Sequence, residues 1–358
     1  MKTLNNDWLK EMKLDHPLVI AGPCSAETEE QVLDIAQQLK DSDATVFRAG
    51  VWKPRTRPGN FEGIGALALP WLQRVKKETG LLIAIEIANA THAKLALEHD
   101  VDILWIGART TVNPFAVQEI ADAIAGTDKI VLVKNPVNPD LELWLGAVER
   151  FQKAGIKKLG VIHRGFSTYQ KTKYRNNPNW QIPIEVKNRF PNLPIICDPS
   201  HICGNRTNLL DVSQTALDLQ FDGLMIETHN NPDKAWSDAK QQVTPNRLKE
   251  MTEELTIRKS SFEADDAKKE LAKLREEINI IDEQLITLLA NRMQVSDKIG
   301  ETKKKQNVAV LQQDRWNEIV AKTLTRSEEL GLSEEFIKKL YKAIHQESIM
   351  HQEKVINS

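Results

Sequence analysis

The chain has 358 residues, a formal net charge of −2 and three cysteines without a CxxC pair. This balance, without a basic stretch interleaved with aromatic residues, argues against a nucleic-acid-binding protein, and the cysteine usage predicts a cytoplasmic protein without structural disulfides. The longest apolar runs, such as residues 81–88, are far shorter than a membrane span, and the opening MKTLNNDWLKEMKLDHP lacks the apolar core of a signal peptide.

Short β-rich runs alternate with amphipathic helical stretches through the first two thirds of the chain. The predicted strands cover residues 18–22, 44–49, 81–87, 103–107, 129–133, 158–163, 194–197 and 223–227. The predicted helices cover residues 29–40, 66–78, 92–99, 115–125, 141–154, 184–190 and 209–219. Eight such units in about 250 residues predict a parallel (β/α)8 barrel. A doubly wound open sheet is the competing architecture, but neither GxGxxG nor GxxxxGK[ST] is present to favour it.

Polar residues follow the carboxyl ends of the predicted strands, where such a barrel places its functional groups. Cys24 follows the first strand and Glu227 ends the eighth. Between them, in strand order, come Arg48, Lys53, Arg55, Thr56, Glu86, Arg109, Lys134, His163, Arg164, Asp198 and His201. Any one of these alone is better explained as a charge that solubilises a loop. Because the pattern repeats at all eight strands, we predict that these groups converge on one mouth.

Six cationic side chains in this set would repel one another in a single cavity unless anionic ligands entered. They are Arg48, Lys53, Arg55, Arg109, Lys134 and Arg164. Guanidinium groups match phosphate and carboxylate groups in bidentate geometry. The set therefore predicts phosphorylated sugars or acids as ligands.

A possible metal site combines one thiol, one imidazole and two carboxylates from Cys24, His201, Glu227 and Asp238. This mixture suits a divalent transition metal, and manganese, iron, cobalt and zinc are all compatible with it. Taken alone, Cys24 is equally well explained as a small buried hydrophobe. The metal hypothesis depends on each residue lying at a strand end or in the following loop.

Several longer motifs resemble those of the 3-deoxy-D-arabino-heptulosonate 7-phosphate (DAHP) synthases, in the subfamily close to the 3-deoxy-octulosonate 8-phosphate synthases. Over about residues 15–250 these are AGPCSAE, FRAGVWKPRT, IGART, VLVKNP, VIHRG, DPSH, DGLMIETHNNP and SDAKQQ. The resemblance implies a metal held by Cys24, His201, Glu227 and Asp238. It implies a phosphoenolpyruvate pocket of Arg48, Lys53, Glu86, Ala108, Arg109, Lys134 and Arg164.

The resemblance also implies that Arg55 and Thr56 hold erythrose 4-phosphate. The sister octulosonate enzymes typically carry a KANRS-like run where this chain has Lys53-Pro54-Arg55-Thr56, which favours the four-carbon sugar. In the implied reaction, carbon 3 of phosphoenolpyruvate attacks the aldehyde, water adds at carbon 2 and phosphate leaves, with Lys53 as proton donor or acceptor. No organic cofactor is needed. A metal-dependent sugar-phosphate aldolase would share the barrel but would usually need a Schiff-base lysine or a more histidine-rich metal site.

A charged stretch over residues 257–269 reads as a linker or frayed helix start, and an apolar heptad pattern follows it. The pattern comprises Leu271, Leu274, Ile278, Ile281, Leu285, Leu288, Val295 and Ile299, and it is interrupted by Arg292. On one helix, Arg292 and Lys303 lie within about 20° of the same face, whereas Arg275 lies about 100° away and about 25 Å along the axis. Another protomer should therefore supply Arg275 if it belongs to the same site.

Residues 271–355 resemble the all-helical chorismate mutases of the intertwined-dimer type. The resemblance implies a polar pocket of Arg275, Arg292, Lys303, Arg315, Ser348 and Gln352, with Arg292, Lys303 and Gln352 in the catalytic role. Lys303 and Gln352 are the implied partners of the breaking ether oxygen. The chain departs from many relatives at Trp316 and Gln312, where acidic residues are usual, so contacts to the substrate hydroxyl are expected to differ.

These observations predict a (β/α)8 TIM barrel over residues 1–256, a linker over 257–269 and a small all-α chorismate-mutase-type domain over 270–358. The predicted protein is a bifunctional enzyme of aromatic amino-acid biosynthesis, at least dimeric through its mutase helices, with prephenate or chorismate feeding back on the barrel. The alternative is an octulosonate 8-phosphate synthase with a catalytically degenerate, regulatory helical domain. A nonenzymatic coiled-coil module would explain the heptads but not Arg292.

Overall fold

The computed structural model describes residues 7–53, 59, 61–169, 172–259, 261, 264–311 and 313–358, without the side chains of residues 313–315 and 320. The chain divides into two compact units, residues 1–260 and 261–358. None of the helices in the described part of the chain combines the length and apolar character needed to cross a lipid bilayer.

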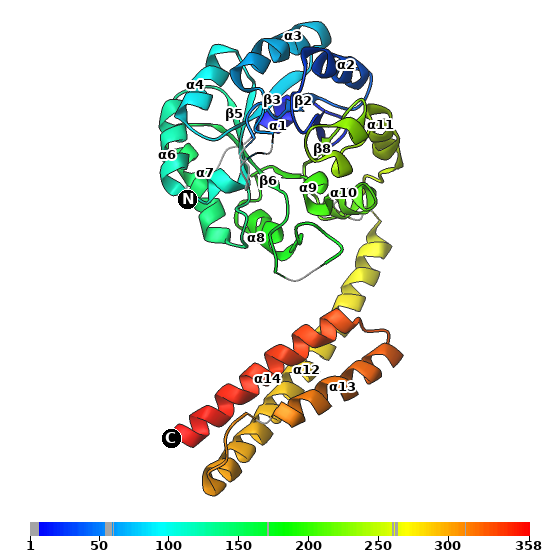
Figure 1. Ribbon diagram of the computed structural model, residues 1–358. Coiled ribbons are helices and arrows are strands. Elements are labelled where there is room, and N and C mark those ends of the chain that lie inside the picture. The colour runs from blue at the N-terminus through cyan, green and yellow to red at the C-terminus, as the bar shows by residue number, and fades with distance from the viewer. Residues whose placement is uncertain are drawn as a thin grey trace. The chain divides into compact units, whose positions relative to one another are not determined.

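The first unit is a closed barrel of eight parallel strands in chain order, with β8 pairing back to β1, which confirms the predicted architecture (Figure 1). The strands are β1 (Leu18–Gly22), β2 (Val46–Ala49), β3 (Leu82–Ile87), β4 (Ile103–Ile106), β5 (Ile130–Lys134), β6 (Lys158–His163), β7 (Ile195–Cys197) and β8 (Gly223–Glu227). In the register that closes the barrel, Gly22 lies opposite Glu227. A Cβ at Gly22 would lie 2.1 Å from the carbonyl oxygen of Arg48, so only glycine permits this approach of β1 to β2.

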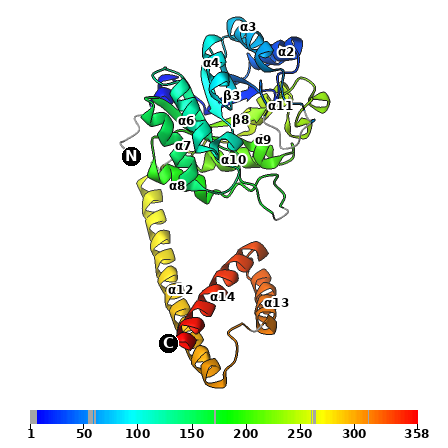
Figure 2. The same cartoon turned by 60° about the vertical axis from the view of Figure 1, so that its left-hand side comes forward.

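Helices surround the barrel (Figures 1 and 2). They are α2 (Glu29–Leu39), η1 (Gly65–Ala68), α3 (Leu69–Thr79), α4 (Ala90–Glu98), α6 (Pro114–Ala123), α7 (Leu141–Lys153), α8 (Gln181–Arg189), α10 (Leu209–Asp218) and α11 (Pro245–Glu254). Thr28, Asn89, Asn113 and Asp140 start four of them by accepting a backbone N–H at the N-cap. Shorter elements between strands and helices are α1 (Trp8–Glu11), α5 (Ala108–Thr111), α9 (Pro199–Cys203), η2 (Pro232–Lys234) and η3 (Ala239–Gln241).

Two apolar clusters form the core of this unit. One fills the layer between strands and helices and includes Phe47, Trp144 and Phe151. The other fills the barrel interior and includes Trp8 from α1, which is 3% exposed and donates its Nε1 proton to the carbonyl oxygen of Leu159 at 2.8 Å. Since Trp8 packs with the interior cluster, the short helix α1 belongs to the barrel core. No sequence pattern predicted this helix.

The second unit consists of α12 (Asp265–Gln306), α13 (Gln313–Glu329) and α14 (Glu334–Asn357). The helix α14 buries Ile337, Ser348 and Gln352. The heptad pattern lies on α12, but the chain itself does not cover most of it. The apolar ladder, defined as Leu274, Ile278, Ile281, Leu285, Leu288, Val295 and Ile299, is 43–64% exposed at every position.

Candidate active site

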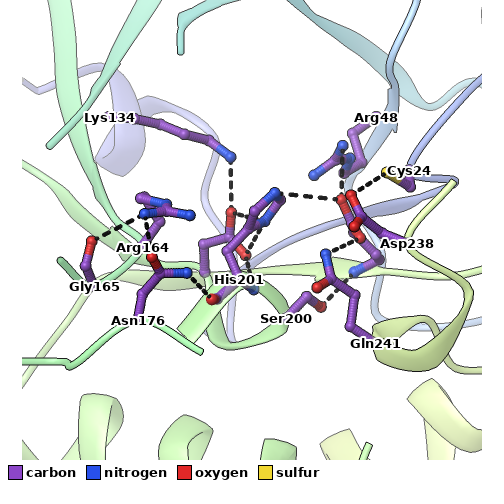
Figure 3. A network of polar contacts seen from close by, with 12 residues as sticks. Cys24, Arg48, Lys134, Arg164, Gly165, Asn176, Ser200, His201, Asp238 and Gln241 are labelled. Atoms are coloured by element: carbon purple, nitrogen blue, oxygen red, sulfur yellow. Dashed lines mark hydrogen bonds and ion pairs between the residues drawn. The ribbon is translucent and has the colours of Figure 1, made fainter. Parts of the chain in front are cut away.

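Most of the polar residues predicted to converge do meet at the carboxyl ends of the strands. Figure 3 shows side chains from β2 and β5 and from the segments after β1, β6, β7 and β8 facing one another across this mouth. Residues brought together there include Cys24, Arg48, Lys53, Lys134, Arg164, Asp198, His201, Glu227 and Asp238. The barrel topology accounts for the convergence, because all parallel strands end at the same rim.

Arg48 and Glu227 form a buried ion pair at the centre of the mouth. The Arg48 Nη2 atom lies 3.3 Å from Glu227 Oε1, and both side chains are at most 1% exposed. Gln241 donates to Glu227 Oε2 at 2.7 Å. Within the described residues, Arg48 Nε, Arg48 Nη1 and Glu227 Oε1 are buried without a hydrogen-bond partner. Such atoms are costly to leave unpaired, which points to a ligand at this position.

Asp198 joins a cation to the predicted metal-binding histidine. It accepts a hydrogen bond from Lys134 Nζ at 2.7 Å and lies 2.8 Å from His201 Nδ1. Although burial opposes ionisation, His201 and Lys134 hold the pKa of Asp198 well below its usual range. Burial lowers the pKa of His201, which favours the neutral ring, and Nδ1–H donates to Asp198. This leaves the Nε2 lone pair available, an arrangement typical of metal-ligating histidines.

Cys24 lies between an ammonium group and a carboxylate. Its Sγ atom is 3.4 Å from Asp238 Oδ2 and 3.0 Å from Lys53 Nζ. Burial and the charge of Glu227 raise the pKa of Cys24 to about 11. Burial alone would lower the pKa of Lys53, but the charges of Cys24 and Glu227 raise it instead. Lys53 is therefore protonated beside the thiol at neutral pH.

Asp238 is held ionised from the outer side of the mouth. Burial would raise the pKa of this carboxyl group, but Arg175 holds it well below its usual value. Arg175 Nη1 lies 3.0 Å from Asp238 Oδ1 and donates to Gln241 Oε1 at 2.8 Å.

The four predicted metal ligands lie in two pairs, Cys24 with Asp238 at 3.4 Å and His201 Nε2 with Glu227 Oε1 at 3.9 Å. Across the part of the chain that the structure describes, no group of three or more His, Cys, Asp or Glu residues has a spacing that would hold a metal ion. The donor chemistry nevertheless fits a metal ion. The His201 ring has an available Nε2 lone pair, Glu227 Oε1 has no hydrogen-bond partner among the described residues, and the Cys24 thiol lies beside a second carboxylate.

A tryptophan forms one wall of the cation-rich part of the mouth. The Trp105 ring lies 4.9 Å from the Arg48 guanidinium carbon and 5.6 Å from Lys134 Nζ. Its Nε1 donates to Glu86 Oε2 at 3.1 Å. A Cβ at Gly107 would lie 2.1 Å from Glu86 Oε1, so glycine is needed for Glu86 to occupy this place. Gly107 precedes α5, which carries the predicted substrate residues Ala108 and Arg109.

Arg164 extends the positive wall. Burial and the nearby Arg175 and Arg109 lower its pKa to about 10 although Asp198 opposes them, so the guanidinium remains charged at neutral pH. Its Nη1 donates to Asn176 Oδ1 at 2.8 Å, and Asn176 Nδ2 donates to the carbonyl oxygen of His201 at 2.6 Å. Asn176 thus links the substrate-binding side of the mouth to the predicted metal ligand.

Some predicted residues are not part of this mouth. The prediction was wrong for His163, whose buried ring packs among Trp144, Phe166, Trp180 and Phe221. Successive side chains of a strand point to opposite faces, and its neighbour Ile162 belongs to the barrel interior, so His163 faces the helical layer. Arg55 and Thr56 lie outside the described residues.

Several residues of the mouth had no role in the predicted site. Asp198 was predicted to lie at the mouth, because it follows a strand within the DPSH motif, but it was not assigned to a substrate or the metal. Asn176, Arg175 and Gln241 come from loops in which no strand end or spacing pattern marks them.

In the helical unit, the structure brings together part of the predicted mutase pocket. Arg292 on α12 donates to the hydroxyl of Ser348 on α14. Gln352 is 8% exposed, and its Oε1 has no hydrogen-bond partner within the described residues. A Cβ at Gly300 would lie 3.1 Å from the Cα of Gln352, so the two helices approach closely here. Lys303, half-buried on α12, donates to the carbonyl oxygen of Val310.

Other predicted mutase residues lie apart or outside the description. Arg275 and Arg292 are on one continuous helix, seventeen positions apart, which separates them by about 25 Å along its axis. The Arg315 side chain and all of Gln312 lie outside the described residues. The Trp316 ring packs against His345 with centroids 4.2 Å apart, so it occupies a wall beside α14 rather than offering an acidic group.

The fold and the two sites define an α/β-barrel enzyme for anionic substrates that carries an additional all-helical domain. Residues 12–262 match the DAHP synthetase I family and residues 274–353 match the chorismate mutase type II family. The chain belongs to the DAHP synthetase I family and contains a chorismate mutase type II domain. This confirms both predicted resemblances and makes the protein a bifunctional enzyme of aromatic biosynthesis.

Comparison with individual proteins gives the same family for the barrel. The phospho-2-dehydro-3-deoxyheptonate aldolase of Thermotoga maritima is 31% identical over 237 residues, which cover 66% of this chain and 68% of that protein. A 2-dehydro-3-deoxyphosphooctonate aldolase of Nitratidesulfovibrio vulgaris is 26% identical over 261 residues, covering 66% and 90% respectively. The crystal structure of the Thermotoga maritima DAHP synthase matches with a TM-score of 0.61 at 30% identity, covering 66% of this chain and 67% of that chain.

Proposed function

We propose that the barrel condenses phosphoenolpyruvate with erythrose 4-phosphate to give DAHP and phosphate, and that it needs a divalent metal ion. The observation that carries this proposal is the buried Arg48 guanidinium, which faces the same Trp105 ring as Lys134 and has two nitrogen atoms without a hydrogen-bond partner among the described residues. Glu227 already neutralises the charge of Arg48, but the two buried donors still need acceptors, which an anionic ligand would supply. Phosphoenolpyruvate brings both a carboxylate and a phosphate to such a site.

Cys24, His201, Glu227 and Asp238 would hold the metal through the four donors that already lie in pairs. A bound divalent metal supplies Lewis-acid polarisation of an aldehyde oxygen, or orients the substrate. Manganese, iron, cobalt and zinc all suit this mixed donor set.

The side chains of the barrel itself orient and neutralise the substrates. Arg48, Lys134 and Arg164 hold phosphoenolpyruvate, together with Glu86, Ala108 and Arg109. Cations fixed in advance lower the barrier through orientation and electrostatics, without a covalent intermediate. Lys53, protonated in the described arrangement, donates to Cys24 Sγ at 3.0 Å and is the proposed proton donor or acceptor.

The sugar substrate separates this proposal from its alternative. Relatives named as octulosonate enzymes match 90% of their length at 26% identity, so a five-carbon sugar phosphate is the second candidate. The test compares turnover of erythrose 4-phosphate and arabinose 5-phosphate by the purified full chain. Preference for arabinose 5-phosphate would replace the proposed synthase activity with that of the octulosonate enzyme.

For the helical unit, we propose rearrangement of chorismate to prephenate in a dimer. The exposed apolar ladder supports association, because stripes of this kind are normally buried against another helix. A groove of about 440 Å3 beside Lys303 is lined by two ladder residues, Val295 and Ile299, so a second chain seated on the ladder would also close this groove. Arg275 of that second chain would complete the pocket formed by Arg292, Lys303, Ser348 and Gln352, together with Arg315.

We further propose that prephenate or chorismate bound at the helical unit changes the activity of the barrel. Such coupling requires that the ligand bind two arrangements of the protein with different affinity. Equal synthase rates with and without saturating prephenate would exclude it. The three free cysteines, all buried, support a cytoplasmic location for the enzyme.

A further inference from the structure

Cys24 and Asp238 lie 214 positions apart in the sequence, yet their side chains meet at 3.4 Å. Here the Cys24 thiol donates to Asp238 Oδ2, but the thiolate that binds a metal would repel this carboxylate, so holding the two ligands together needs support from the surrounding chain. Asp238 also adopts a left-handed backbone conformation, with φ of 45°, which is uncommon for a residue other than glycine. The loop that carries Asp238 must therefore be fixed by contacts elsewhere.

Glu27 makes two of these contacts. Its Oε1 accepts the backbone N–H of Trp236 at 2.7 Å, and its Oε2 lies 3.3 Å from His229 Nε2. Glu27 and His229 are each only 5% exposed. One buried carboxylate from the loop after β1 thus holds the beginning and the end of residues 229–236, the segment that leads from β8 to Asp238.

The tautomer of His229 shows that both carboxylate oxygens of Glu27 accept hydrogen bonds. The backbone N–H of Asn231 donates to His229 Nδ1 at 2.9 Å, so Nδ1 is the unprotonated nitrogen of the neutral ring. The proton is then on Nε2 and is donated to Glu27. The Glu27 carboxylate only accepts hydrogen bonds and therefore suits these two donors. A side chain that also donates, such as an amide, would place a donor opposite one of them.

Two neighbouring contacts join the same pair of loops. Cys24 donates its backbone N–H to Gln242 Oε1 at 2.9 Å, and Gln242 Nε2 donates to the carbonyl oxygen of Ser237 at 2.9 Å. The hydroxyl groups of Ser25 and Ser237 lie 2.5 Å apart. The buried side chains of Glu27, Gln242, Ser25 and Ser237 therefore bind the Cys24 loop to the Asp238 loop at several points.

We propose that Glu27 is a positioning residue of the metal site, which holds the Asp238 loop against the Cys24 loop so that both ligands face one ion. The inference rests on the proposed metal site and assigns to Glu27 a role that requires no contact with metal or substrate. Substituting a residue that supports metal ligands typically weakens metal binding by roughly 10- to 100-fold.

The test substitutes Glu27→Gln, which keeps the shape but places an amide donor opposite one of two existing donors. Co²⁺ is titrated into the metal-free full chain, and the thiolate-to-Co²⁺ charge-transfer absorption reports whether Cys24 is a ligand. Glu30→Gln is the matched control, because it makes the same change at an exposed residue of α2. We expect the Co²⁺ dissociation constant to rise roughly 10- to 100-fold in Glu27→Gln, with a weaker charge-transfer band, and to stay unchanged in Glu30→Gln.

A second pair of variants covers the case in which Glu27→Gln does not fold, as judged by circular dichroism of the metal-free protein. His229→Gln retains an acceptor for Asn231 and a donor for Glu27 and should bind Co²⁺ nearly as the wild type does, whereas His229→Leu should bind weakly. Wild-type affinity and absorption in Glu27→Gln or His229→Leu would overturn the positioning role. Absence of the charge-transfer band from the wild type itself would instead overturn the proposed metal site.

Discussion

Asp198 lies 2.8 Å from His201 Nδ1, and this contact orients the neutral ring so that Nε2 faces Glu227. The same carboxylate accepts from Lys134 at 2.7 Å, so one buried group fixes a predicted metal ligand and a predicted substrate ligand together. The two functions of the barrel mouth are therefore coupled through a residue that belongs to neither.

Asp198→Asn tests whether one carboxylate serves both roles. The amide keeps one acceptor oxygen but places an NH2 donor opposite one of the two existing donors, so His201 loses its fixed tautomer and Lys134 loses its counter-charge. We expect metal affinity to fall roughly 10- to 100-fold and the KM for phosphoenolpyruvate to rise as well. Metal titration and steady-state assays at saturating metal measure the two effects separately. Asp211→Asn, an exposed change on α10, serves as the control. A loss confined to metal affinity would refute the shared role.

Arg48→Lys tests the proposed anion site. Lysine keeps the positive charge but loses the planar guanidinium with its two free nitrogen atoms, Nε and Nη1. The lysine ammonium group can replace one of these two donors, and one lost hydrogen bond to a charged group costs about 1.5–3 kcal/mol, so we expect kcat/KM for phosphoenolpyruvate to fall by roughly 10- to 100-fold. Arg74→Lys on the exposed surface of α3 should leave the kinetics unchanged, because exposed ion pairs contribute little. Equal kinetics for Arg48→Lys and wild type would remove Arg48 from the substrate site.

His163 should make the stability of the barrel depend on pH. Burial lowers its pKa to about 3, whereas an unfolded chain titrates near about 6.5. Between these values the unfolded state binds the proton and the folded state does not. The free energy of unfolding therefore decreases as the pH falls below about 6.5, by at most about 1.4 kcal/mol per pH unit, and the contribution is fully present above that pH.

The variant His163→Leu removes this titration and keeps an apolar side chain among Trp144, Phe166, Trp180 and Phe221. Denaturant unfolding followed by tryptophan fluorescence at several values between pH 7 and about pH 4.5 compares the two slopes. A shallower slope in the variant is expected. If both proteins lose stability equally over this range, His163 does not contribute to the dependence.

The barrel was predictable because its signals are local. Each strand is a short apolar run bounded by a turn, and β1, β6 and β8 have the predicted limits. The helix α1 was not predicted because four residues carry no usable periodicity, although Trp8 belongs to the core. The side of the sheet on which His163 lies was also not predicted. A shift of one residue along a strand moves a side chain from one face of the sheet to the other.

The supporting contacts of the site were beyond the reach of sequence patterns. Glu27 meets His229 across 202 positions and Arg164 meets Asn176 within an irregular loop, so neither contact follows from helical or strand spacing. The strand ends indicated which rim would carry the charges, whereas the pairing of charges at that rim depends on side-chain packing in three dimensions. The position of Arg275 is a different case, because helix geometry alone shows that it cannot join Arg292 within one chain.

The apolar ladder on α12 should be the surface on which two chains associate. Leu285→Glu places a charge at a position that is 51% exposed in the single chain, and burying it in a dimer would be unfavourable. We expect this variant to sediment as a smaller species than the wild type and to lose mutase activity, while the barrel remains folded. Glu283→Gln, on the same helix but outside the ladder, should change neither property.

Arg275 and Arg292 should serve one mutase pocket from different chains. If so, Arg275→Ala and Arg292→Ala are each nearly inactive alone, but a mixed dimer regains one intact pocket, with Arg275 from one chain and Arg292 from its partner. Random reassociation of equal amounts gives mixed dimers as half of the population, each with one of two pockets restored, so prephenate formation should recover to about a quarter of the wild-type rate. Mixing the two variants without dissociation and reassociation is the control and should restore nothing. If reassociated mixtures stay as inactive as the separate variants, Arg275 does not act across the dimer, and the pocket must be completed within a single chain.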